Sequence, residues 1–403
     1  MQREQFIVRE PLLNTQERVL GYELSWQQAS NGDRPSEADQ LALVRFVAEQ
    51  LGDAGAGEKL GDHVLFIELT PALLGHEAVL SLPPRNAVLA VRGADLSTPD
   101  AVAAVRAARE QGYGISAREV NLATIDRNLL PLLTYVELQL GAGDFAVQVQ
   151  HFRSFNLSSL RLIARPVTSW QAYDLCASLG IYAFVGNLHL ASRPGVRARD
   201  LNPAQAMILQ LMDMVRKNAD VKQLEGVLKR DAALSYKLLR YINSAGFGLG
   251  CEIQSLKHAV TMLGYSPLYR WLALLLATAT TTGYSPVLMQ TAVIRGRFAE
   301  LLGQTFLPRN EAENLFVAGM FSLLDKLLGV PMEDVLEKIQ LSGSVTQALL
   351  SREGIYGPFL ALAEACELNS ADVAPRAASL CIGSRQVNEA HLAALAWAQT
   401  LQL

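Results

Sequence analysis

Charged and amide side chains stand near the ends of several short apolar segments in the first half of the chain. In chain order they are Glu23, Glu68, Arg92, Arg118, Glu119, Gln139 and Arg165. Carboxylates could hold Mg²⁺, which takes oxygen ligands, and a pair of such ions could support hydrolysis. The arginines indicate a different chemistry, because a guanidinium group pairs with carboxylates or with phosphate oxygens.

The elements that must position these side chains are short runs rich in β-branched and aromatic residues, which predict strands. The runs are Phe6–Leu13, Val19–Trp26, Val64–Leu69, Ala87–Arg92, Gly114–Arg118, Tyr135–Leu140, Ser159–Ala164 and Tyr182–Gly186. Helical patterns between them cover Glu37–Leu51, Pro99–Gln111, Phe145–Phe155 and Trp170–Leu179. The short connection between the first two strands predicts an antiparallel hairpin. From there the β-α order predicts a small (β/α)8 TIM-type barrel with an irregular entry, whose working residues lie at the C-terminal strand ends.

A second domain is predicted after the barrel. The segment SRPGVRARD at 192–200 has the proline, glycine and charge content of a linker, and strand patterns stop beyond it. Helical segments with clear starts follow, such as the one that begins after Asp220. We therefore expect a barrel domain at 1–191, a linker at 192–202 and an all-helical domain at 203–403.

Composition excludes several classes of protein. The 403 residues are half hydrophobic and 18% charged, with a net charge of −4, and neither half has the basic character of a nucleic-acid binder. The four cysteines form no CxxC pair, so we expect no zinc site. We also expect no other metal and no cofactor. The most apolar run, Trp271–Thr282, is shorter than the roughly 20 residues of a membrane span. No secretory signal is visible, so we expect a cytoplasmic protein.

The barrel motifs resemble those of a known family. They are GYELSW at 21–26, FIELTP at 66–71, GYGISA at 112–117 followed by Arg118-Glu119, and YVELQLGA at 135–142. Their order and spacing resemble EAL domains, the cyclic di-GMP phosphodiesterase barrels, over nearly all of residues 1–190. The resemblance implies a site in which Glu, Asn and Asp side chains hold two divalent cations.

Most of the ligand positions that this resemblance implies carry other residues. The signature Glu survives as Glu23, but Leu24-Ser25 replaces Ala-Leu and Gln27 stands where Arg is expected. The remaining departures are Glu68 for Asn, the neighbourhood of Val91 and Arg92 for Glu, Arg118-Glu119 for Asp-Asp, Gln139 for Lys, Gly141 for Asp, and Ala164-Arg165-Pro166-Val167-Thr168 for Ala-Glu-Gly-Val-Glu. We therefore expect that the chain is not an enzyme.

Two roles remain for the arginines. Arg118 and Arg165 could pair with Glu23 and Glu68, which would otherwise be costly carboxylates in a barrel mouth. Alternatively, they could bind the phosphates of intact cyclic di-GMP, since guanidinium suits phosphate oxygens. Residual cyclic di-GMP phosphodiesterase activity is the reading that the replaced ligands favour least.

The second half resembles another family. The stretch 229–248, KRDAALSYKLLRYINSAGFG, followed by IQSLKHAVTMLG at 253–264, is similar to the HDOD domain, which lacks the His-Asp metal ligands of related phosphohydrolases; no His-Asp dipeptide occurs here. The motif residues are Asp231, Lys237, Arg240, Asn243 and Ser244. Asp231 and Asn243 could simply satisfy backbone groups at helix ends. Lys237 and Arg240, three apart, could form a partner surface or an ordinary solvated face.

The order of the two domains is that of the bacterial EAL-HDOD signalling proteins, also called the YuxH type. The resemblance implies a non-catalytic regulatory or scaffold protein linked to cyclic di-GMP-dependent motility, attachment or virulence. It would act through contacts with other signalling proteins. A cyclic di-GMP receptor that binds without hydrolysis is the alternative.

Overall fold

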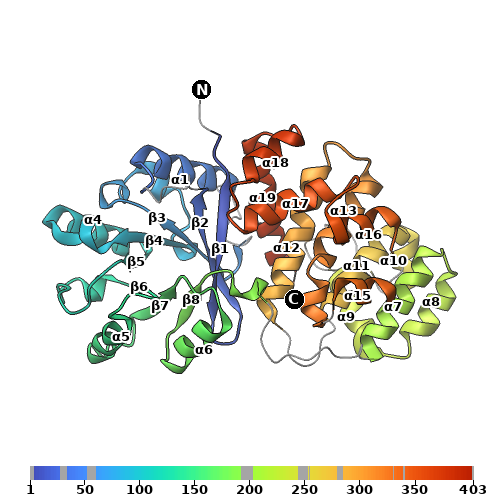
Figure 1. The fold of residues 1–403 in the computed structure, drawn as a ribbon, viewed down its shortest axis with the longest axis horizontal. Helices are drawn as coiled ribbons and strands as arrows, with labels where there is room; N and C mark the ends of the chain where they lie inside the picture. Colours follow the sequence, from blue (N-terminus) through green and yellow to red (C-terminus); the bar gives the residue numbers. More distant parts are fainter. Residues whose placement is uncertain are drawn as a thin grey trace. The chain divides into compact units, whose positions relative to one another are not determined.

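The computed structural model describes residues 4–27, 34–51, 60–191, 203–243, 253, 255–278, 285–329, 331–338 and 341–401. The chain forms two compact units (Figure 1). The first contains residues 1–191 and 366–371, and the second contains 192–365 and 372–403. The linker expected at 192–202 lies outside the described residues.

The first unit is built on a closed barrel whose strands follow one another in chain order. The strands are β1 (Ile7–Asn14), β2 (Val19–Trp26), β3 (Val64–Glu68), β4 (Ala87–Arg92), β5 (Gly114–Arg118), β6 (Tyr135–Gln139), β7 (Arg161–Arg165) and β8 (Ala183–Val185). Each predicted run overlaps one of them, and the ends agree within two residues, so the strand predictions are confirmed.

The barrel is mixed rather than a regular (β/α)8 repeat. The predicted hairpin is confirmed, and β1 runs antiparallel to both β2 and β8, while the other neighbours are parallel. A four-residue connection cannot hold a parallel crossover helix, which is why β1 and β2 lack one. Between β5 and β6, where every residue is described, only a 3₁₀ turn at Leu130–Leu132 occurs. The expected (β/α)8 pattern is corrected at these two places.

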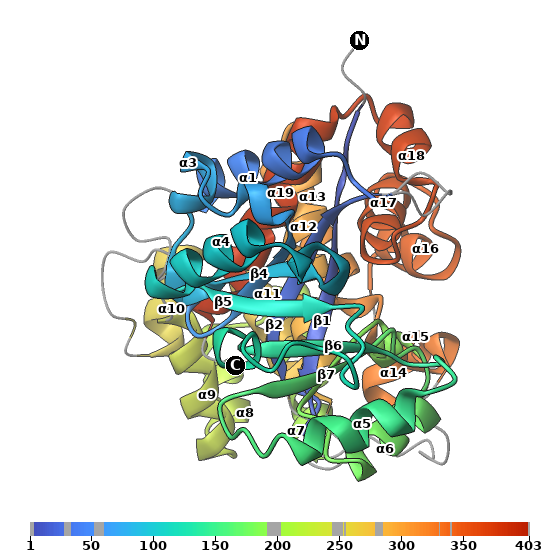
Figure 2. The ribbon, with the colours of Figure 1, turned by 90° about the vertical axis from the view of Figure 1, so that its left-hand side faces the viewer.

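Helices cover the outside of the barrel (Figure 2). They are α1 (Glu37–Leu51), α3 (Glu77–Leu80), α4 (Pro99–Glu110), α5 (Phe145–Ser154) and α6 (Trp170–Ser178). α4 begins where the sequence predicts, because the Thr98 hydroxyl accepts a hydrogen bond from the Ala101 amide at 3.2 Å and Pro99 occupies the first helical position.

The barrel interior is filled in two layers. An apolar layer contains Leu12, Phe66, Val88, Tyr135, Ile163, Ala183 and Val185. Because side chains alternate across a strand, the residues two positions further along share the same inward face. On β3, β6 and β7 those residues are Glu68, Glu137 and Arg165. The apolar layer therefore closes the barrel floor beneath a charged layer.

The second unit is helical throughout its described residues, as predicted. Its helices are α7 (Pro203–Arg216), α8 (Val221–Leu228), α9 (Ala232–Ile242), α10 (Leu256–Leu263), α11 (Tyr265–Thr278), α12 (Pro286–Gly303), α13 (Arg309–Phe321), α14 (Leu324–Leu328), α15 (Met332–Lys338), α16 (Gly343–Ser351), α17 (Gly357–Glu367), α18 (Val373–Ser379) and α19 (Ser384–Thr400). α12 and α13 cross closely at two glycines, since a Cβ on Gly319 would stand 2.7 Å from the Cα of Gly296. Small residues here set the spacing of the helical core.

Candidate functional site

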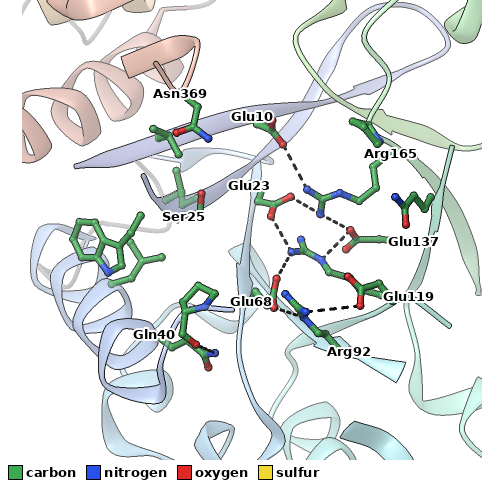
Figure 3. Close-up of a pocket in the computed structure, with 18 residues that line it drawn as sticks. Glu10, Glu23, Ser25, Gln40, Glu68, Arg92, Glu119, Glu137, Arg165 and Asn369 are labelled. Atoms are coloured by element: carbon green, nitrogen blue, oxygen red, sulfur yellow. Dashed lines mark hydrogen bonds and ion pairs between the residues drawn. The ribbon is translucent and has the colours of Figure 1, made fainter. Parts of the chain in front are cut away.

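A cavity of about 360 Å³ opens where the barrel strands end. All seven barrel residues that the sequence singled out line it, and Figure 3 shows most of them together with other lining side chains. The strands explain this convergence, because Glu68, Arg92, Arg118, Gln139 and Arg165 are each the last residue of a strand. The sequence-derived expectation that strand ends bring these side chains together matches this arrangement.

Arg118 lies at the centre of the cavity. Its Nη1 donates to Glu23 Oε1 at 2.8 Å and to Glu68 Oε2 at 3.1 Å. Its Nε lies 2.9 Å from Glu137 Oε2. The Arg118 side chain is only 7% exposed, so three carboxylates compensate one buried guanidinium group. Such compensation is required, because an unpaired charge at this depth is strongly destabilising.

Arg165 forms a second cationic centre, which Figure 3 shows near Glu10 and Glu137. Its Nη1 donates to Glu137 Oε2 at 2.8 Å and lies 2.7 Å from Glu23 Oε2, and its Nη2 lies 3.5 Å from Glu10 Oε2. Glu23 and Glu137 therefore each bridge both arginines.

An outer group of side chains extends the network towards solvent. Arg92 Nε donates to Glu68 Oε1 at 2.7 Å, and Arg92 Nη1 lies 3.8 Å from Glu119 Oε2. The Glu119 side chain is 61% exposed, so this last contact is weak. Glu119 has a positive φ of 52°, which marks the sharp turn at which the chain leaves β5.

The pKa shifts follow from burial and from these contacts. Burial would raise the pKa of the Glu137 carboxyl, but Arg118, Arg165 and a hydrogen bond from Ser116 outweigh it and hold that pKa below its ordinary value. Burial would lower the pKa of Arg118, yet its carboxylate partners raise it. The pKa of Glu10 is raised, first by burial and then by the charge of Glu23. The contacts therefore favour the ionised form of Glu137, whereas Glu10 is protonated more readily than an ordinary glutamate.

The charges of the cavity do not balance. Five carboxylates and three guanidinium groups line it, a formal charge of −2. The arginines are thus already committed to carboxylates, and the mouth as a whole is anionic. This electrostatic balance disfavours the approach of a dianionic ligand.

Sequence reasoning missed two members of the network, Glu10 and Glu137. Glu137 stands two residues before Gln139 on the same strand and so shares its inward face. Glu10 is the register partner of Glu23 across the β1–β2 hairpin. The period-2 alternation of these strands was the signal that could have found both.

The carboxylates of the cluster face guanidinium groups. Within the described parts of the chain, no group of three or more His, Cys, Asp or Glu side chains is placed to hold a metal ion. Guanidinium nitrogens stand within 3.1 Å of Glu23, Glu68 and Glu137 oxygens, in the places where a cation would have to bind. In the same residues, no helix is both long enough and apolar enough to cross a membrane.

The HDOD-like motif residues lie apart from any charged cluster of this kind. The Asp231 carboxylate accepts from the Leu234 amide at 2.9 Å and so caps α9. Asn243 forms two hydrogen bonds with the backbone of Ile253, at 2.8 and 2.7 Å. Lys237 and Arg240 are exposed on α9, and Ser244 lies outside the described residues. Asp231 and Asn243 therefore have local structural roles.

Together the two units define a closed-barrel domain combined with a helical HDOD domain, because the HDOD family model matches residues 201–347. The cyclic di-GMP phosphodiesterase CdgJ of Vibrio cholerae is 26% identical over 367 residues, covering 90% of this chain and 84% of that protein. The uncharacterized protein YuxH of Bacillus subtilis is 23% identical over 408 residues and covers 98% of each chain.

A solved EAL enzyme, Bd1971 in a form with cAMP and cyclic di-GMP bound, is also similar to part of the chain. The likeness has a TM-score of 0.36 at 14% identity and covers 46% of this chain. This chain spans 61% of the length of that solved chain.

Replacing Glu137 tests the arginine–carboxylate network. The Glu137→Gln variant leaves Arg118 and Arg165 with one bridging charge fewer, so we expect a loss of about 3 kcal/mol in unfolding free energy at neutral pH. The Glu119→Gln variant removes a mostly exposed partner of Arg92 and should cost at most about 1 kcal/mol. Chemical denaturation of both variants measures the difference. Equal losses would contradict the network.

The stability difference between the wild type and Glu137→Gln should depend on pH. The pKa of Glu137 lies below its ordinary value of 4.5, so its ionised form stabilises the fold above that pH. This stabilisation is lost as the pH falls through the lowered pKa, whereas Glu137→Gln never has it. The Tm gap between wild type and Glu137→Gln should therefore shrink below about pH 4.5. A gap that stays constant with pH would assign the effect to packing.

Proposed function

We propose that this chain is a non-catalytic signalling or scaffold protein of cyclic di-GMP-related regulation, which acts through protein–protein contacts. In this proposal the barrel is a degenerate EAL-like domain. The similarity to CdgJ, named a cyclic di-GMP phosphodiesterase, supports the connection to cyclic di-GMP. That name also makes activity the first property to test.

The observation that carries the proposal is the position of Arg118 among Glu23, Glu68 and Glu137. Two-metal hydrolysis requires carboxylate oxygens that bridge cations roughly 4 Å apart. In this barrel the candidate oxygens accept from, or lie against, guanidinium nitrogens at 2.7 to 3.1 Å. Binding a cation there would require displacement of fixed positive charges, so the arginines take the place of the metal ions.

The residues of the mouth then have a structural task. Arg118 and Arg165 connect carboxylates from β1, β2, β3 and β6, and so tie the antiparallel entry of the barrel to its parallel strands. A mouth held in this way keeps the fold of the barrel without a bound ligand. It leaves the exterior of both units available for recognition.

The exposed face of α9 is the surface that we assign to a partner. Tyr236 is 67% exposed, and Lys237 and Arg240 are also exposed near it on the same helix. An exposed tyrosine next to cationic side chains is typical of the centre of an interface. The partner that fits this surface is a protein with an acidic rim.

Binding of intact cyclic di-GMP is the alternative, and one observation favours it. Arg118 Nη2 is buried and has no hydrogen-bond acceptor among the described residues. A phosphate oxygen could accept from it. The formal charge of −2 around the cavity opposes this, since the ligand is itself a dianion.

The activity test is incubation of the full chain with cyclic di-GMP and Mg²⁺ or Mn²⁺, followed by chromatography. We expect no linear product above the background of the Glu23→Gln variant, because the oxygens of Glu23 are held by arginines. Product that forms with the wild type and is lost in Glu23→Gln would overturn the non-catalytic proposal. Calorimetry on the same samples separates the receptor alternative, for which heat without product would be observed.

The partner surface is tested with the full chain as bait in a lysate of its source cells. A Tyr236→Ala, Lys237→Glu double variant should lose a protein that the wild type retains, because it removes an aromatic anchor and reverses a charge. Arg106→Glu, an exposed change on α4 of the barrel, is the control and should retain that protein. Retention of the same proteins by all three baits would contradict the assignment of α9.

A further inference from the structure

The helical unit contains a second cavity, of about 560 Å³, far larger than a packing defect and within the range of small-molecule sites. It lies among α11, α12, α13 and α19, and all of its lining residues belong to the second unit. None of the HDOD motif residues lines it. Its charged side chains form an arrangement distinct from that of the barrel.

Two arginines in this cavity share one buried carboxylate. Arg270 binds Glu300 through both nitrogens, Nη1 to Oε1 at 2.8 Å and Nη2 to Oε2 at 2.9 Å. Arg297 Nη1 donates to the same Glu300 Oε2 at 2.8 Å. The Glu300 side chain is 4% exposed, and those of Arg270 and Arg297 are 14% and 23% exposed. One positive charge in this trio is uncompensated.

The remaining lining charges do not remove this excess. Glu313 lies 3.4 Å from Arg309 Nε, and Arg309 is itself 92% exposed. The cavity as a whole is therefore lined by three arginines and two glutamates, a formal charge of +1. Burial lowers the pKa of Arg270, Glu300 raises it and neighbouring Arg297 lowers it again, so that the pKa lies below its ordinary value. An additional anion near these arginines would be favoured.

Arg270 and Arg297 differ in how many of their hydrogen-bond donors Glu300 occupies. Arg270 uses both terminal nitrogens on Glu300, and its guanidinium carbon lies 4.0 Å from the centre of the Phe316 ring. Arg297 uses only Nη1 on Glu300, so its second terminal nitrogen is not committed to that carboxylate. Arg297 is therefore the residue with donors to spare, and Arg270 and Glu300 hold it in place.

Apart from Gln304, the rest of the lining is apolar or aromatic. The half-buried ring of Trp397 stands 5.5 Å from the Arg297 guanidinium carbon, and Leu263 and Leu307 also face the cavity. A ring or alkyl body could pack against these side chains while an anionic end reaches Arg297.

We propose that this cavity binds a small organic carboxylate with an apolar or aromatic body, with Arg297 and Arg309 at the carboxylate and Trp397 against the body. A carboxylate matches the single excess charge of the site. A phosphate monoester carries nearly two negative charges at neutral pH and would leave one of them uncompensated beside Glu300 and Glu313. The charge balance therefore selects the carboxylate over the phosphate.

The test compares three probes of one shape on the full chain by ligand-observed NMR, namely phenylacetate, phenyl phosphate and 2-phenylethanol. We expect phenylacetate to bind saturably with a Kd of about 1 mM or tighter. 2-Phenylethanol, which lacks the charge, should bind about tenfold more weakly or not at all. Tighter binding of phenyl phosphate would overturn the charge argument, and absence of saturable phenylacetate binding would overturn the site.

Two variants locate the binding. Arg297→Gln should weaken phenylacetate binding about tenfold, because it removes the spare donors. Arg309→Ala should weaken it about threefold and leave the fold intact, since this side chain is almost fully exposed. The control is Arg385→Ala, which removes another exposed arginine in an i,i+4 ion pair, with Glu389, away from the cavity. The proposal would be contradicted if Arg309→Ala and Arg385→Ala bound phenylacetate with equal affinity and Arg297→Gln bound it as tightly as the wild type.

Discussion

The contact of Arg118 with Glu23, Glu68 and Glu137 is the interaction on which the barrel mouth depends. A guanidinium group that is 7% exposed is costly to bury without nearby carboxylates, and those carboxylates would be equally costly without it. Each member is supplied by a different strand, so the pairing also fixes how the strand ends meet. The charged layer is thus a structural component of the barrel and not a solvated rim.

This constraint limits what the mouth can do. We propose that carboxylate oxygens paired with Arg118 and Arg165 do not serve as ligands of a hard cation, and that pairing with carboxylates makes the arginines poorer partners for phosphates. The barrel and the helical unit each contain a network of arginines and glutamates, but the two networks have net charges of opposite sign. Glutamates outnumber arginines around Arg118, whereas two arginines share Glu300 in the helical cavity. We therefore propose the second cavity as the site for a small organic anion.

Much of this architecture could be predicted from the chain alone, and the failures have physical causes. Strands such as Val19–Trp26 and the helix start at Pro99 follow from local chemistry, so they were predicted. The prediction for β6 rested on its last residue, Gln139, and so missed Glu137. Alternation along the strand puts both side chains on one face. The Arg297 and Glu300 cavity could not be predicted, because its walls come from helices whose packing no local pattern encodes.

We propose that arginines occupy the place of metal ions in the barrel mouth, and metal binding to the folded chain is the sharpest test of this. A ligand that binds the native state raises Tm in a saturable way. The account predicts that millimolar Mg²⁺ or Mn²⁺ changes the Tm of the wild type no more than that of Glu23→Gln. A saturable rise in Tm that disappears in Glu23→Gln would contradict it.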